Sequence, residues 1–113
     1  MNETIAILTH AYTLIKKGWT RKYFAINKHG KGVDWSDEQA CRFCLTGGIR
    51  RATYNLFPKE SKQKQFIIAN DATYQVSKYV TDLGYKSTIS FNDSSTKAEV
   101  LNAIKQVINA VKS

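Results

Sequence analysis

SDEQACRFCLTGGIRRATYNLF, residues 36–57, decides how this chain folds. It starts with Ser36 to Gln39, which has the pattern of a capping box. In that motif, a serine side chain and a side chain three residues later satisfy the first backbone N–H groups of a helix. Small and apolar residues then recur at helical spacing: Ala40, Phe43, Cys44, Gly47, Ala52 and Leu56. We therefore predict one helix from Ser36 to the residue before Pro58.

Gly47 and Gly48 lie in the middle of this predicted helix. Each glycine costs about 1 kcal/mol relative to alanine in a helix interior. Either the helix breaks there, or a neighbouring helix packs so closely that no side chain fits. Because the helical spacing continues past both glycines, we predict close packing.

Cys41 and Cys44 are the only two cysteines in the chain. Structural zinc needs four ligands, and His10 and His29 are not spaced as a ligand pair. A thioredoxin-like pair follows a strand within a βαβ pattern, which is missing here. We therefore predict no metal and no cofactor, and interpret both thiols as small apolar core residues on one helix face. Redox reactivity and metal binding are the less favoured alternatives.

Working outward, three more segments have the apolar spacing of amphipathic helices: residues 4–17, 66–83 and 96–111. The last one opens with a second capping box, from Thr96 to Glu99. Between the helices, residues 22–35 predict a small β-hairpin around the Gly30–Gly32 turn, and residues 87–92 predict a short extended crossing. The fold class is thus all-α or mainly-α, with about four helices.

The length and composition are those of one small domain spanning residues 1–113. The chain has 113 residues, of which 42% are hydrophobic, enough to build a core. No apolar run approaches the ~20 residues of a membrane span, and the N-terminus is not a secretory signal. We therefore expect a cytoplasmic protein that does not insert into a membrane.

The net charge of +8 is concentrated in residues 16–31, KKGWTRKYFAINKHGK, which contain six Lys/Arg and no acid. Such a stripe attracts phosphate backbones, and its aromatic residues can stack on unpaired bases. The alternative is a solvated basic face with its aromatic side chains packed inward. The candidate nucleic-acid-binding residues are Lys16, Lys17, Trp19, Arg21, Lys22, Tyr23, Lys28, Lys31, Arg50 and Arg51.

Recognisable catalytic motifs are missing, including a P-loop, HExxH and GxSxG. Asp34 and Asp37 are explained by a helix start, and Asn92 to Ser95 by a turn that leads into the Thr96 cap. His29 has no legible partner for acid–base work. The sequence therefore predicts no catalytic residue.

Three stretches, KGWTRKYFAIN, ACRFCLTGGIRRA and ISFNDSSTKAEVLNAIKQVI, resemble a domain family of unassigned function found in bacteria and phages. The family pattern corresponds to Gly18-Trp19, Phe43-Cys44, Gly47-Gly48, Arg51-Ala52, Phe91-Asn92-Asp93, Thr96 and Glu99. Phe91 replaces the usual tryptophan, and Cys41 stands where the family has no particular cysteine. The resemblance implies a small helical domain and supplies no activity.

Three functional hypotheses follow. The first is a non-enzymatic accessory protein, encoded by a phage or mobile element, that binds a macromolecular partner such as a host protein. The second is a nucleic-acid-binding module that uses the basic stripe together with Arg50 and Arg51. The third is an enzyme of unrecognised type. The sequence does not indicate an oligomeric state.

Overall fold

Eight elements follow one another between residues 2 and 113, the part of the chain that the computed structural model describes. They are α1 (Asn2–Lys17), β1 (Ala25–Ile26), β2 (Gly32–Val33), β3 (Arg42–Phe43), α2 (Leu45–Leu56), α3 (Lys62–Asp82), α4 (Thr88–Ser94) and α5 (Lys97–Lys112). The protein is mainly helical, which confirms the predicted class. Within the described residues it has five helices where the sequence predicted about four.

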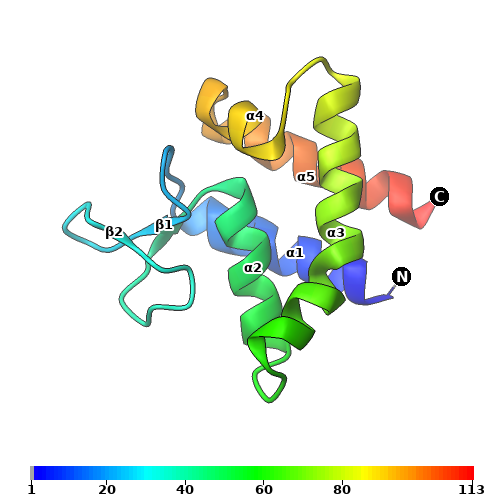
Figure 1. The fold of residues 1–113 in the computed structure, drawn as a ribbon. Helices are drawn as coiled ribbons and strands as arrows, with labels where there is room; N and C mark the ends of the chain where they lie inside the picture. The colour runs from blue at the N-terminus through cyan, green and yellow to red at the C-terminus, as the bar shows by residue number, and fades with distance from the viewer. Residues whose placement is uncertain (1) are drawn as a thin grey trace.

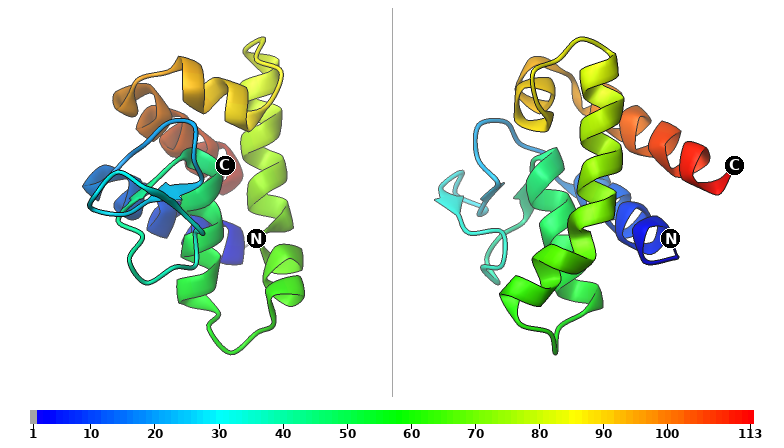
Figure 2. Two further views of the ribbon diagram at one scale, coloured as in Figure 1. Left: turned by 60° about the vertical axis from the view of Figure 1, so that its left-hand side comes forward. Right: turned by 45° about the vertical axis from the view of Figure 1, so that its right-hand side comes forward.

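The core forms around α1, which packs against α2, α3 and α5. In Figure 1, α2 and α3 lie in front of α1 and α5. The views in Figure 2 keep the strands on the side of α2 that is turned away from α3. The largest fully buried apolar side chains are Ile7, Leu8, Ile15, Leu45, Ile49, Val76, Val80, Val100 and Ile104.

The predicted capping box of the last helix is confirmed. The Glu99 N–H donates to Thr96 Oγ1 at 3.2 Å, and the Thr96 N–H donates to Glu99 Oε1 at 2.8 Å. The predicted end of α3 is confirmed as well. Gly84, two residues after the last residue of α3, has a φ of 101°, a conformation that suits glycine and ends the helix. Both helix boundaries were legible from local sequence.

The predicted hairpin is also confirmed, and a third strand joins it. β1 lies between β2 and β3 and pairs antiparallel with both. Ala25 stands opposite Val33 and Phe43 in the row that faces the core, while Ile26 stands opposite Gly32 and Arg42 in the outer row. Strand alternation therefore buries Phe43 and exposes Arg42.

The predicted helix start at Ser36 is wrong, because α2 begins at Leu45. Asp34 accepts hydrogen bonds from the backbone and hydroxyl of Ser36, and Asp37 accepts one from the Gln39 N–H. These aspartates stabilise turns, the role that competes with helix capping for such side chains. The following residues then extend along β1 as β3.

The predicted extended crossing at 87–92 is wrong as well, because this segment contains α4. Ser87 is the N-cap, and its side chain accepts a hydrogen bond from the Ser90 N–H at 3.0 Å. Ile89 and Phe91 consequently do not share a face: Phe91 is buried, whereas Ile89 is 50% exposed.

The prediction of close packing at the two glycines holds within the shorter α2. Gly47 and Gly48 are both buried. A Cβ at Gly48 would lie 2.7 Å from Ile15 Cδ1 of α1, and a Cβ at Gly47 would overlap the carbonyl oxygen of Phe24. Gly48 thus allows α1 to pack closely against α2, and Gly47 allows the backbone before β1 to do so.

Candidate functional site

Asn92 of α4 joins three segments that are distant in sequence. Its side chain is 1% exposed, and Oδ1 accepts hydrogen bonds from Trp19 Nε1 at 2.8 Å and from the Leu45 N–H at 3.0 Å. Its Nδ2 donates to the Thr20 carbonyl oxygen at 3.1 Å. The amide thereby fixes α4 against the start of α2 and against the segment before β1.

Cys44 lies beside this network as the N-cap of α2. Its Sγ accepts a hydrogen bond from the Gly47 N–H at 3.3 Å, and burial raises the pKa of the thiol above its ordinary value. The prediction that Cys44 is buried is confirmed. Cys41 is exposed directly before β3, so its predicted place in the core, on one helix face with Cys44, is wrong.

We expect the two thiols to differ sharply in reactivity. In the native protein iodoacetamide should alkylate Cys41 and spare Cys44, because a buried thiol with a raised pKa forms little thiolate. Mass spectrometry of peptides after timed labelling measures both sites, and labelling in urea should make them equal. The Cys41→Ser variant isolates the alkylation of Cys44. If Cys44 reacts in the native protein as fast as Cys41 does, the buried N-cap position of Cys44 is contradicted.

A groove of about 460 Å³ opens between the hairpin and α4. Asn92 and Cys44 line it, and so do the exposed apolar side chains of Tyr23, Phe24 and Ile89. The remaining lining residues are Lys22, Gly32, Val33, Asp34 and Asp93. This volume lies in the range of small-ligand sites.

Both carboxylates of the groove are held by hydrogen bonds. The Ser36 hydroxyl and N–H lower the pKa of Asp34, with Lys62 and Arg50 adding to the effect, so Asp34 is ionised at neutral pH. Asp93 Oδ1 accepts a hydrogen bond from the Lys22 N–H at 2.9 Å. That bond holds Lys22 at a φ of 72°, which is unusual for a residue with a side chain.

The structure divides the ten predicted binding residues into two groups. Lys16, Lys17, Lys22, Tyr23, Lys28 and Lys31 are exposed. Four others are engaged within the fold. The indole of Trp19 is bound to Asn92, and the guanidinium of Arg21, although this residue is exposed, donates to the Ser95 carbonyl oxygen. The aromatic residues likewise divide, since Trp19 packs inward and Tyr23 does not.

Arg50 and Arg51 belong to the engaged group. Arg51 donates to the carbonyl oxygens of Trp35 and Asp37, at 3.0 and 2.8 Å. The guanidinium of Arg50 lies between two aromatic rings, 5.0 Å from the centre of Phe24 and 4.9 Å from that of Phe66. Both arginines therefore stabilise the base of the hairpin.

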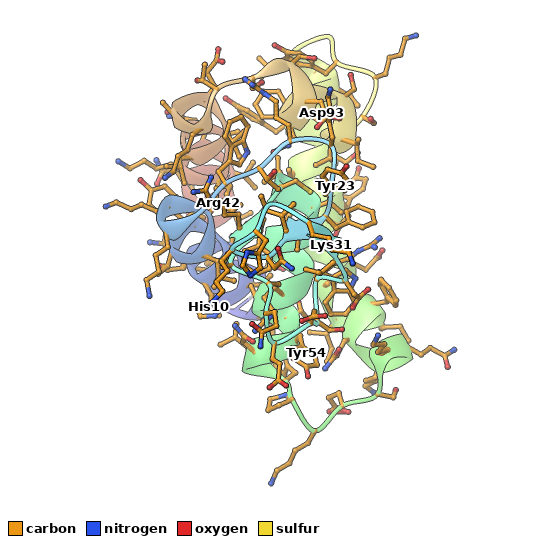
Figure 3. All side chains as sticks on the ribbon, turned by 90° about the vertical axis from the view of Figure 1, so that its left-hand side faces the viewer. His10, Tyr23, Lys31, Arg42, Tyr54 and Asp93 are labelled. Carbon is orange, nitrogen blue, oxygen red and sulfur yellow. The ribbon has the colours of Figure 1, made fainter. Side chains whose placement is uncertain are left out.

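Sequence reasoning missed Arg42, which is exposed on the outer row of the sheet. Figure 3 shows Arg42, Lys31, Tyr23 and Asp93 on the face turned to the viewer. The alternation of Arg42 and Phe43 is a strand signal, and it was hidden by the helical interpretation of residues 36–57. The groove was missed because its walls come from segments far apart in sequence.

The cations of this face lack acidic partners. Between residues 2 and 113, one ion pair forms within 4.0 Å, between Lys62 and Asp34 at 3.9 Å. The same residues contain no cluster of three or more His, Cys, Asp or Glu side chains suited to a metal ion. None of the described helices is long and apolar enough to cross a membrane.

The fold and the site define a mainly helical protein in which a small antiparallel sheet and a short helix flank a groove, with exposed basic residues on the hairpin. The chain belongs to the Family of unknown function (DUF6197), whose family model matches residues 1–110. This confirms membership of a family of unknown function. No curated protein and no solved structure matched the chain.

Proposed function

We propose that this protein is a non-enzymatic accessory protein that binds single-stranded nucleic acid. The contact surface consists of Tyr23, Lys28, Lys31 and Arg42 on the three-stranded sheet and the loops beside its strands. Lys28, Lys31 and Arg42 neutralise phosphates, and Tyr23 stacks on an unpaired base. The observation that carries the proposal is an exposed Tyr23 beside exposed, unpaired basic side chains on one face.

Two physical arguments support this choice of partner. Neutralising phosphates releases condensed counterions, so a basic face without acidic partners binds nucleic acid at moderate salt. Aromatic rings gain about 1–3 kcal/mol per stacked base, but only when that base is unpaired, which favours single strands. The exposed thiol of Cys41 is consistent with a reducing compartment, and we propose a cytoplasmic location.

Reversing the charge of Lys28 and Lys31 tests the proposal. We expect Lys28→Glu/Lys31→Glu to abolish binding of a fluorescent 12-nucleotide single strand, measured by anisotropy at about 50 mM salt, where phosphate contacts are strongest. Replacing Lys31 alone should flatten the plot of log affinity against log salt by about 0.7, the value for one phosphate of a single strand.

The matched control is Lys105→Glu/Lys112→Glu, which lowers the net charge equally on α5, away from the hairpin (Figure 1). These variants should bind like wild type. If wild type binds no DNA or RNA strand at this salt concentration, nucleic-acid binding is excluded and a protein partner becomes the favoured reading. If both double variants lose the same amount of binding affinity, the binding depends on the net charge of the protein and not on the hairpin residues, and the proposal is contradicted.

A further inference from the structure

We propose that the groove between the hairpin and α4 accepts one unpaired base of the bound strand and prefers cytosine or adenine, whose amino group can donate to a carboxylate, over thymine. The base stacks on Tyr23 and donates to the Asp93 carboxylate. This inference rests on the proposed function, since the strand is held by the basic residues outside the groove.

The apolar walls of the groove are held by contacts within the protein. Tyr23 is 54% exposed, and its ring rests on Gly32, where a Cβ would lie 2.6 Å from Tyr23 Cδ1. The ring of Phe24 is held by the guanidinium of Arg50. With the half-exposed Ile89 across from the hairpin, these side chains present preorganised apolar area to a flat, unsaturated ring.

The sign of the charge changes between the groove and its surroundings. The charged residues that line the groove are Asp34, Asp93 and Lys22, so acids outnumber bases there, whereas Lys28, Lys31 and Arg42 are exposed on the hairpin outside it. In Figure 3, Tyr23 lies between Asp93 and Lys31. Carboxylates repel phosphate, so the backbone of a strand is directed to the basic residues and an uncharged base to the groove.

Asp93 supplies the selectivity. Its Oδ1 accepts from the Lys22 N–H at 2.9 Å and from Asn92 Nδ2 at 3.4 Å, while no donor within residues 2–113 reaches Oδ2. The amino groups of cytosine and adenine are donors that a carboxylate accepts. Thymine carries a carbonyl oxygen where cytosine carries its amino group, and its one ring N–H lies between two carbonyl oxygens that a carboxylate repels. A carboxylate therefore favours the amino-bearing base.

The test compares 12-nucleotide dC and dT strands on wild type and on Asp93→Asn. Wild type should bind the dC strand at least about fivefold more tightly, the lower limit for a base-specific contact. In Asp93→Asn, the amide oxygen can still accept from the Lys22 N–H, and its NH₂ group can donate to the thymine carbonyl. The preference should therefore fall to unity or reverse. Asp82→Asn, an equal change of charge at the end of α3, is the control and should keep the wild-type preference.

A second variant keeps the test decisive if Asp93→Asn is unstable. Tyr23→Ala should bring the dC/dT affinity ratio toward unity as well as weaken binding, because the base no longer stacks within the groove. Tyr74→Ala, which removes a similarly exposed tyrosine from α3, should keep the wild-type ratio. If strands bind through Lys28 and Lys31 but the dC/dT ratio is the same in wild type and Asp93→Asn, the base site is refuted and the proposed function stands. If no strand binds, both fall.

Discussion

Asn92→Ala is expected to lower the free energy of unfolding by about 3–5 kcal/mol, a large part of the stability of a protein of this size. The substitution leaves Trp19 Nε1, the Leu45 N–H and the Thr20 carbonyl oxygen without their partner. An orphaned group costs about 1–3 kcal/mol where it is buried, and the missing amide leaves a cavity as well. The bond to Leu45 is buried, and those to Trp19 and Thr20 are partly buried. Urea unfolding followed by tryptophan fluorescence measures the loss.

The exposed amide of Asn102 on α5 provides the comparison for Asn92. Asn102→Ala should change the stability by less than about 0.5 kcal/mol, as surface substitutions do. The Asn92 network would be refuted as a stabilising element if the two alanine variants unfolded at similar urea concentrations. Trp19→Phe removes one bond of the network and should fall between them.

Gly47→Ala is expected to destabilise the protein by about 3 kcal/mol, the upper part of the range for overpacking. Its methyl group would overlap the Phe24 carbonyl oxygen, which is backbone and moves only if β1 moves with it. At Gly48 the nearest atoms are Cδ1 and Cγ1 of the Ile15 side chain, at 2.7 and 2.9 Å, which can shift where a backbone oxygen cannot, and alanine there regains about 1 kcal/mol of helix propensity. Gly48→Ala should therefore be close to neutral.

The pair of glycine variants separates backbone contact from side-chain contact within one helix turn. Thermal unfolding of both proteins under identical conditions gives the comparison, and Gly48→Leu should be much worse than Gly48→Ala because Ile15 has no room for a branched chain. Equal effects of Gly47→Ala and Gly48→Ala would contradict the packing described for α2. Gly47→Ala should also disturb the groove, since Phe24 forms part of its wall.

Local sequence signals predicted what local interactions decide. The Thr96–Glu99 box forms as predicted because both of its hydrogen bonds lie within one turn of helix. The similar signal at Ser36 failed because Asp34 and Asp37 offer the same backbone N–H groups an alternative in tight turns. α4 was missed because its seven residues are too few to show a helical period against the spacing of Ile89 and Phe91.

The basic stripe shows where sequence reasoning reaches its limit. The composition of residues 16–31 indicated a cationic surface, and the lysines are indeed exposed. Which cations are available depends on partners far along the chain: Arg21 is engaged by the carbonyl of Ser95, 74 residues away. No spacing rule within the stripe could distinguish Arg21 from Lys28, because the difference arises only when α4 reaches the hairpin.

The bonds of Asn92 join positions that are 47, 72 and 73 residues apart. Contacts of such separation close long loops of the chain, and they slow folding because the entropy of loop closure is lost before they form. The groove therefore exists only after both halves of the polypeptide have been synthesised and have met. A ligand in it binds the native state alone, and by mass action at one hundred times its dissociation constant it would add about 2.7 kcal/mol to the stability of the whole protein.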